Sequence, residues 1–445
     1  QICKTLSEYF WLIAKQQTLE PDAPSFGVDL DKERWDAYAL AMHESSKRRF
    51  FDRATPPHIF TLVSLAGLSA LAMNIFLPSL GGMTEYFQTE YAFMQLSVAL
   101  YLAINGFLQL FIGPISDKYG RRSVILWGLG LFNIATLGCL LAPTAEVFMV
   151  FRMFQAVIAV AMVLARAVVR DIYPQDQAAS MIGYVAMGMS LVPMIAPAIG
   201  GLLEVWYGWH ASFVMLLGFG VLLYVITWFD LAETAAPSNN TLRQQFAEYP
   251  ELLKSPRFWG YCMASAFSSG AFFAYLGGAP FVGEQVYGLT PDQLGLYFAA
   301  PGLGYFIGNF ITARFSARVG VNPMIFWGNV ICAGSLLPAL LLSLAGAGSA
   351  AAFFGCVVFL GIGNGMVIPN AQAGMLSVRP HLAGTASGLG SAIMIGGGAA
   401  LSAIAGALLQ PGSTDLPLIT LMTLSCVAAL GVILLVMRRE RRLRL

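Results

Sequence analysis

Twelve stretches of about 20 predominantly apolar residues recur along the chain, each bounded by charged, proline-containing or glycine-rich segments. A stretch of this length crosses the roughly 30 Å hydrocarbon core of a bilayer as an α-helix. A helix satisfies its own backbone hydrogen bonds in lipid, whereas an open strand cannot. The expected spans are residues 58–79, 93–113, 124–142, 147–169, 180–203, 210–230, 258–282, 293–315, 323–345, 350–372, 382–409 and 416–437. The sequence therefore predicts an all-α membrane protein with twelve transmembrane helices.

Composition excludes a water-soluble globule of this length. Of the 445 residues, 57% are hydrophobic and only 11% are charged, whereas soluble domains carry about 25% charged residues. The net charge of +1 gives no field that would attract nucleic acid. The six cysteines are scattered singly, without the spacing of a disulfide framework or a metal site. We therefore expect the lipid bilayer as a partner, and we expect no nucleic acid, metal or cofactor.

From residue 42 onward, the Lys and Arg residues that lie outside the spans or at their ends all fall on one side of a twelve-span topology. They are Lys47, Arg48, Arg49, Arg53, Lys118, Arg121, Arg122, Arg170, Arg243, Lys254, Arg257, Arg314, Arg318, Arg379, Arg438, Arg439, Arg441, Arg442 and Arg444. The opposite loops contain no Lys or Arg, only acids such as Glu85, Glu90, Glu146, Glu204, Glu284, Asp292 and Asp415. Because Lys and Arg accumulate in cytoplasmic loops, we expect both termini in the cytoplasm of a bacterium, with the helices in its inner membrane.

The spans divide into two groups of six, separated by the long polar loop 231–257. A short internal repeat supports duplicated halves: residues 113–120 match residues 313–320, with Ser116 and Gly120 aligned to Ser316 and Gly320. The expected organisation is a cytoplasmic tail (1–57, of which 1–41 is interpreted as an extension or a fused segment), a six-helix bundle (58–230), a cytoplasmic linker (231–257), a second bundle (258–437) and a basic tail (438–445). Duplicated halves are typical of transporters whose substrate site lies between the repeats.

The segment Gly113-Pro-Ile-Ser-Asp117-Lys-Tyr-Gly120-Arg121-Arg122 is the most specific motif in the chain. Its two glycines allow a tight turn and the close approach of a neighbouring helix. Asp117 and Arg121 can pair with each other or with a helix end. Two interpretations follow: an ionic latch that closes the cytoplasmic side, or a positive-inside anchor without a gating role.

This segment resembles the signature between the second and third helices of the major facilitator superfamily, G-x-x-x-D-x-x-G-R-R/K. The segment Arg152-Met-Phe-Gln155-Ala156 is similar to a further family element, and Ala196-Pro197-Ala-Ile-Gly200-Gly201 resembles the motif of its twelve-helix drug:proton antiporter branch. The segments 76–79 and 165–173 resemble the Bcr/CflA drug-resistance exporters. The resemblance implies a role for Arg152 in proton coupling. It also implies that Arg170 and Asp171 pair with Asp117 and Arg121.

Charged residues inside spans are costly and are functional candidates by default. Arg152 and Arg166 lie fourteen residues apart in the fourth span, which places them on one face of an uninterrupted helix. Arg166 could instead extend to the membrane surface. In the fifth span, Pro193 and Pro197 are expected to kink the helix. Close packing at Gly200 and Gly201 would be compatible with a hinge or seal.

Proton coupling is the point at which this sequence departs from the family. Related antiporters commonly carry an acid in the middle of the first span, where this chain has Asn74, and none of its 24 acidic residues lies mid-span. Asn cannot exchange a proton near neutral pH. The coupling candidates are Arg152, Arg166 and Glu204, together with Asp117, Asp171 and His210.

We expect the substrate cavity to be lined by uncharged polar and aromatic side chains. The candidates are Asn74, Tyr101, Asn105, Gln109, Gln155, Phe267, Phe272, Phe273, Tyr275, Asn309, Asn364 and Asn370. For each Asn and Gln the alternative is interhelical hydrogen bonding, and for each Phe it is packing. Such a cavity suits small amphipathic compounds of the phenicol or bicyclomycin kind.

The predicted function is that of a monomeric secondary active transporter exporting such drugs by alternating access in antiport with protons. An alternative is an exporter or facilitator of one native metabolite without proton coupling at the first span. A membrane enzyme or receptor is disfavoured, because the sequence has no metal cluster, catalytic constellation or nucleotide-binding motif.

Overall fold

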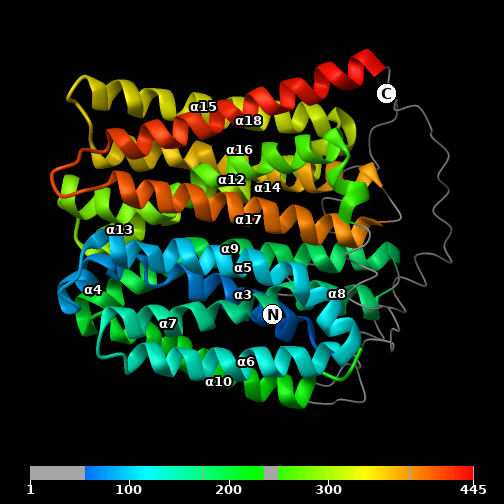
Figure 1. Ribbon diagram of the computed structural model, residues 1–445, viewed down its shortest axis with the longest axis horizontal. Helices are drawn as coiled ribbons and strands as arrows, with labels where there is room; N and C mark the ends of the chain where they lie inside the picture. Colours follow the sequence, from blue (N-terminus) through cyan, green and yellow to red (C-terminus); the bar gives the residue numbers. More distant parts are fainter. Residues whose placement is uncertain (1–55, 174, 235–248, 380–381, 444–445) are drawn as a thin grey trace, which may run out of the picture. The chain divides into compact units, whose positions relative to one another are not determined.

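In the computed structural model, residues 56–173, 175–234, 249–379 and 382–443 are described, and their regular elements are all helical (Figure 1). The first half contains α3 (Ile59–Asn74), η1 (Leu77–Ser79), α4 (Leu80–Tyr86), α5 (Tyr91–Tyr119), α6 (Arg121–Leu140), α7 (Ala145–Gln155), η2 (Ala156–Ile158), α8 (Ala159–Ile172), α9 (Gln175–Tyr207) and α10 (His210–Asp230). The second half contains α12 (Pro256–Phe281), η3 (Val282–Val286), α13 (Pro291–Tyr297), α14 (Ala299–Val319), α15 (Val321–Leu344), α16 (Ala350–Val378), α17 (Ala383–Leu408) and α18 (Leu416–Leu443). Residues 1–55, most of the predicted linker and residues 444–445 lie outside the described part.

Ten helices in the described part are long and apolar enough to cross a membrane, and Leu191–Tyr207 of α9 is a shorter apolar helix. The twelve predicted spans coincide with helices to within a few residues, except that α5 and α16 extend about six residues further. The 26-residue helix α12 is not among the ten. It carries Ser265, Ser268 and Ser269, and most of its side chains are buried. A helix enclosed by other helices contacts protein rather than lipid, so it needs less apolar character.

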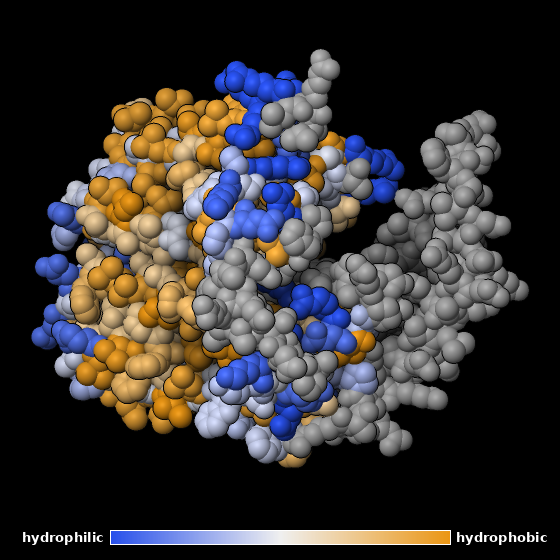
Figure 2. Space-filling model, turned by 45° about the vertical axis from the view of Figure 1, so that its right-hand side comes forward, coloured by the Kyte–Doolittle hydropathy of each residue, from blue (hydrophilic) through white to orange (hydrophobic). Residues whose placement is uncertain are grey.

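The side chains that face outward form an apolar band. Figure 2 shows hydrophobic side chains between two hydrophilic rims on the visible face. Large apolar side chains such as Trp127, Ile134 and Phe310 are exposed in this part of the chain. An exposed apolar surface of this extent would be unstable in water, and it matches the hydrocarbon layer of a bilayer. We call the rim that carries Arg121, Arg379 and Arg438 the basic end, and the rim that carries Glu85, Glu204 and Glu284 the acidic end.

The signature segment is mostly helical, although it lies between the predicted spans 93–113 and 124–142. Helix α5 runs through Pro114 and Asp117 to Tyr119, and Gly120 alone makes the turn into α6 with φ of 88°. Gly320 makes the matching turn between α14 and α15 with φ of 93°. Each glycine N–H donates to the backbone carbonyl oxygen of the serine four residues earlier: Gly120 to Ser116 at 3.0 Å, and Gly320 to Ser316 at 2.9 Å. The repeat identified in the sequence is therefore a repeated turn in the structure.

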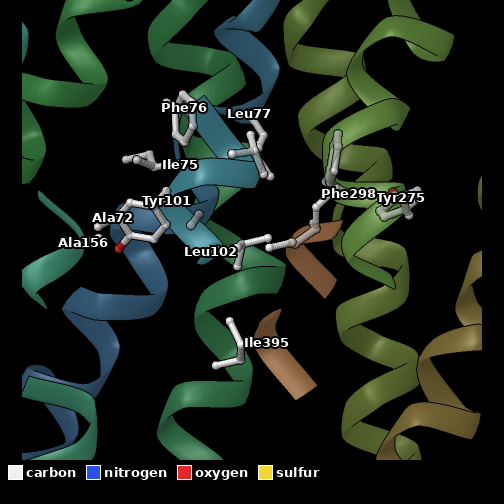
Figure 3. Close-up of a cluster of buried hydrophobic side chains, with 14 of the residues drawn as sticks. Ala72, Ile75, Phe76, Leu77, Tyr101, Leu102, Ala156, Tyr275, Phe298 and Ile395 are labelled. Carbon is white, nitrogen blue, oxygen red and sulfur yellow. The ribbon is translucent and has the colours of Figure 1, made fainter. Parts of the chain in front are cut away.

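The two halves meet along backbone contacts at small residues. A Cβ on Gly201 of α9 would lie 2.2 Å from the carbonyl oxygen of Pro291, and one on Gly295 of α13 would lie 2.4 Å from that of Pro197. Gly106 of α5 packs against α17, where a Cβ on Gly106 would lie 3.3 Å from the carbonyl oxygen of Ala392. Figure 3 shows Leu102 of α5 and Ile395 of α17 beside this contact. Contacts of this kind depend on glycine, because any side chain would separate the backbones.

The two turn glycines give a testable comparison. Gly320→Ala should lower the free energy of unfolding by about 1–2 kcal/mol, because an L-residue is strained at positive φ. Gly120→Ala should cost more, because its Cβ would also lie 2.2 Å from Glu233, whose carboxylate is tethered to the next two backbone N–H groups. Thermal unfolding of the detergent-solubilised variants measures both. Equal losses of unfolding free energy at the two positions would show that the contact with Glu233 does not add to the cost of Gly120→Ala.

Candidate functional site

The motif at the basic end builds an ionic network around Arg121. The guanidinium, whose side chain is only 7% exposed, pairs with Asp117 at 2.6 Å and with Asp171 at 3.0 Å, and it also donates to the Ser116 hydroxyl. Arg170, by contrast, is exposed and forms no ion pair within the described residues, so the expected pairing of Arg170 with Asp117 is wrong. The close approach expected at Gly113 is also wrong, because a Cβ there would meet nothing within 4 Å.

Glu233, which the sequence analysis left in the linker, completes this network. Its carboxylate accepts from the backbone N–H groups of Arg121 at 2.7 Å and Arg122 at 3.2 Å. It therefore caps the positive N-terminal end of α6. The Arg122 side chain caps the negative C-terminal end of α10, because it donates to the backbone carbonyls of Trp228 and Leu231 there. All these groups belong to the first half, so the network joins its helices to one another rather than joining the two halves.

Arg152 forms the second charged site, and it is completely buried. Its guanidinium lies 4.2 Å from the ring centroid of Phe76 and 4.1 Å from that of Tyr101. It also donates to the Gln155 side chain, which in turn donates to the Thr136 hydroxyl at 2.8 Å. Figure 3 shows the Phe76 and Tyr101 side chains close together. The Gln155 amide is thus committed to holding Arg152, which departs from its expected role in lining a cavity.

The charge of Arg152 is stabilised without an ion pair to any residue in the described part of the chain. Its Nε and Nη2 groups have no hydrogen-bond partner there. A buried unpaired cation is costly, and a desolvated cation–π contact offsets about 2 kcal/mol or more of that cost. The Tyr101 hydroxyl and the Asn74 side-chain oxygen are also buried without partners. The first half therefore contains polar groups whose hydrogen-bonding capacity is not used internally.

The fourth span is interrupted by the short 3₁₀ turn η2 between α7 and α8. A 3₁₀ turn advances about 120° per residue rather than 100°, so these three residues shift Arg166 by roughly 60° around the helix. Arg152 and Arg166 then lie within roughly 20° of each other, which keeps them on one face as expected. Arg166 lies within electrostatic reach of Tyr305 on α14, in the second half. It therefore points toward the interface between the halves rather than extending to the membrane surface.

Several expected cavity residues are instead used for packing. Tyr275 lies in an aromatic cluster, with ring centroids 5.1 Å from Phe298, 6.2 Å from Phe353 and 6.1 Å from Phe354. Phe272 stacks on Tyr275 at 6.1 Å. Tyr275 is therefore packed in a hydrophobic core, but its buried hydroxyl has no hydrogen-bond partner within the described residues, and its cavity role stays a prediction.

Most of the amide candidates have a hydrogen-bond partner, but only Gln155, Asn364 and Asn370 bond across helices, as the alternative expected. Asn370 bonds Ser316 and Thr312 of α14, and Asn364 accepts from Ser268 of α12 at 2.9 Å. On α5, Gln109 donates to Asn105 at 2.9 Å. Asn74 and Asn309 donate to backbone carbonyls of their own helices. Two surface pockets of 570 and 270 Å³ are lined by other residues, on α12 and α18 and on α3, α9 and α10 respectively.

The glycines and prolines of α9 make the closest contacts of this region. Gly200 admits the carbonyl oxygen of Ile75, which would lie 1.7 Å from a Cβ there. Gly201 and Pro197 contact α13 of the other half, as described above. Helix α9 continues through both Pro193 and Pro197. A hinge at these prolines stays a prediction, whereas close packing at the glycines is observed. Glu204, the acidic coupling candidate, lies near the end of α9, where its carboxylate contacts Gly82 of α4.

A family model described as Major Facilitator Superfamily matches residues 62–401 and 284–444. The chain belongs to the major facilitator superfamily. It is a multi-pass membrane transporter rather than an enzyme, as predicted. Two solved structures share the fold: the peptide transporter POT in complex with sulfate (TM-score 0.69, 13% identity, covering 86% of this chain and 94% of that one) and a bacterial homolog of the human lysosomal transporter Spinster (TM-score 0.65, 17% identity, covering 85% and 96%).

The sequence is similar to those of several drug-resistance proteins. A chloramphenicol resistance protein of Pseudomonas aeruginosa is 31% identical over 334 residues, 72% of this chain and 76% of the relative. A bicyclomycin resistance protein homolog of Haemophilus influenzae is 27% identical over 390 residues, 87% and 97% of the two chains. Multidrug resistance protein D of Escherichia coli is 29% identical over 376 residues, 83% and 93%. The predicted resemblance to Bcr/CflA-like exporters is confirmed.

The Arg152 site predicts a large effect from a change that preserves charge. Arg152→Lys should lower the transport rate about tenfold or more, because an ammonium lacks the flat guanidinium that contacts both Phe76 and Tyr101. Substrate flux in proteoliposomes measures this. Arg257→Lys is the matched control, since the Arg257 side chain is 39% exposed and pairs with Glu440 at the basic end. Similar effects at the two sites would contradict a special role for Arg152.

Proposed function

We propose that this transporter exports small amphipathic compounds, of the phenicol or bicyclomycin kind, by alternating access. The observation that carries the proposal is the coverage of most of the chain by relatives named for resistance to such compounds. The contacts between the halves support it, because backbone contacts at Gly201, Gly295 and Gly106 let two bundles separate without breaking interlocked side chains. Rocking of two repeats about a central site is the usual motion of such folds.

The proposed topology has twelve transmembrane helices, with α9 and α12 added to the ten that are apolar enough by themselves. The basic end faces the cytoplasm, as the positive-inside rule requires. The bacterial inner membrane is the proposed location, and a monomer the proposed unit. We assign the Arg121 network the role of a brace that keeps the first bundle rigid as it moves, because its partners all lie in that bundle.

Substrate contact is assigned to the buried polar groups with unused hydrogen-bonding capacity. These are Arg152, Tyr101 and Asn74 in the first half, together with the free amide nitrogen of Asn364 in the second. An uncharged amphipathic compound with carbonyl or hydroxyl groups would satisfy them at little desolvation cost. The amide of Asn370, which bonds Ser316 and Thr312 of α14, would hold two helices in place beside the site, whereas Gln109 and Asn105 pair within α5.

Antiport with protons is the proposed energy source, carried by a group other than a first-span acid. A second candidate is export or facilitated diffusion of one native metabolite without such coupling. The observation that favours this second candidate is the environment of Asn74, which replaces the usual acid and spends its amide N–H on the Ala70 carbonyl oxygen at 2.7 Å.

Inside-out vesicles with an imposed pH gradient distinguish the two candidates. We expect the parent protein to accumulate labelled chloramphenicol and to move protons in the opposite direction. Asn74→Asp is the matched variant, because it restores an acid at nearly constant side-chain volume. Gradient-independent exchange by the parent, with coupling only in Asn74→Asp, would favour the second candidate. Failure of the parent to move any resistance-type compound, in vesicles that transport another solute, would overturn drug export.

A further inference from the structure

At the acidic end, two carboxyl groups from opposite halves are held in a notch on α4. Gly81 and Gly82 form the notch: a Cβ on Gly81 would lie 1.9 Å from Glu284 Oε2, and one on Gly82 would lie 2.3 Å from Glu204 Oε1. Glu204 comes from α9 of the first half and Glu284 from η3 of the second. The Glu284 side chain thus crosses the interface and occupies the space of a missing side chain on α4.

The notch holds acids without a compensating cation. Glu204 Oε2 and Glu284 Oε1 are both buried and have no hydrogen-bond partner within the described part of the chain. The completely buried Ser79 hydroxyl lies beside the Glu204 carboxyl group and has no partner of regular geometry there either. The loops of this end contain no Lys or Arg in the sequence. Two buried carboxylates without a cation repel each other, and a shared proton removes that repulsion.

The other titratable groups around the notch do not supply positive charge near Glu284. Glu85 of α4 adds a third negative charge, and Tyr91 of α5 directs its hydroxyl to the Gly277 carbonyl oxygen at 3.5 Å. Asp292 of α13 is partly buried and carries a further negative charge. His210 of α10 stacks on Trp209, with ring centroids 3.7 Å apart, and lies edge-on to Tyr86.

We propose that Glu204 and Glu284 form a proton-binding site that latches the two halves together at the acidic end. One proton is bound when the halves meet, and it is released to the solvent when they separate and both carboxyl groups become hydrated. The inference rests on the proposed alternating access. The proton is taken from, and returned to, the solvent at the acidic end, so the site controls closure there and does not itself carry a proton across the membrane. The site also explains why α4 has two consecutive glycines at this point.

The pH range of the latch follows from Glu284, which lies beyond the end of α12. Burial, followed by the negative charges of Glu204 and Glu85, raises the pKa of Glu284 from its ordinary value of 4.5 to about 8. An acid whose pKa is higher in the closed state binds more protons there, so closure is favoured by acidification. The closed-to-open ratio should change by about tenfold per pH unit between these two values and level off above the higher one.

Distance measurements between spin labels test the latch directly. The exposed residues Leu141, which directly follows α6, and Leu344, the last residue of α15, lie at the acidic end, one on each half. With Leu141→Cys and Leu344→Cys in the full chain, and the native cysteines replaced by alanine, pulsed electron paramagnetic resonance reports the separation of the halves. In the parent, we expect the short-distance population to fall as the pH rises from about 5 to about 8.

Variants identify the groups responsible. Glu284→Gln should remove most of the response and leave the halves closed, because a neutral amide fits the notch at every pH. Glu204→Gln should narrow the pH range over which the closed-to-open ratio changes. It removes the repulsion between Glu204 and Glu284, but Glu284 stays buried. Glu146→Gln, an exposed acid at the same end, and His210→Gln are controls that should respond like the parent. Glu284→Asp, which keeps the titratable group, should retain the response.

A parent whose distances do not change with pH, or a Glu284→Gln variant that responds like the parent, would overturn the latch. The measurement needs no substrate, so its failure is distinct from failure of the proposed drug export. Proton-coupled flux in vesicles, together with a Glu284→Gln variant whose distances still change with pH as in the parent, would leave the proposed function standing and exclude this site as its latch.

Discussion

The structure depends on satisfying polar groups inside a layer that offers no water. Long helices solve this for the backbone, but each buried polar side chain needs its own partner. The protein meets the requirement in two ways. Some amides are paired across helices, as Asn370 is with Ser316 and Thr312, and others bond within their own helix, as Gln109 does with Asn105. A small set around Arg152 is held by aromatic rings and one amide, and keeps unused donors and acceptors. The second set differs from the first in that a ligand can still bind to it.

The two ends of the bundle use opposite electrostatic arrangements. At the basic end, Arg121 lies between Asp117 and Asp171, and charge is balanced inside the first half. At the acidic end, Glu204 and Glu284 come from different halves and meet without a cation. A balanced network is insensitive to moderate changes of pH, whereas two facing carboxyl groups depend on their shared proton. Movement of the halves would therefore leave the first arrangement intact and change the second.

The glycine contacts connect the fold with this behaviour. Gly201, Gly295 and Gly106 bring backbones of the two halves together without side chains between them. Gly81 and Gly82 do the same for two carboxyl groups. Such surfaces give close contact with little interlocking, which suits an interface that must form and separate repeatedly. In the same bundle, the turn glycines Gly120 and Gly320 serve local geometry, since their φ angles of 88° and 93° are strained for other residues.

The sequence by itself determined the helices, the division into halves and the family. These follow from local properties: apolar length, the placement of Lys and Arg, and motifs such as the one from Gly113 to Arg122. It also identified Arg152 as a costly charge inside a span, and it predicted Asp117 and Asp171 as partners of Arg121. It could not identify Tyr101 as a contact of Arg152, or Glu233 as the cap of α6, because packing of distant helices brings these groups together. For the same reason, it did not predict the aromatic cluster around Tyr275, and Glu284 looked like one loop acid among several. Whether a buried polar group is paired, packed or available depends on neighbours far away in the chain, and only the tertiary structure decides it.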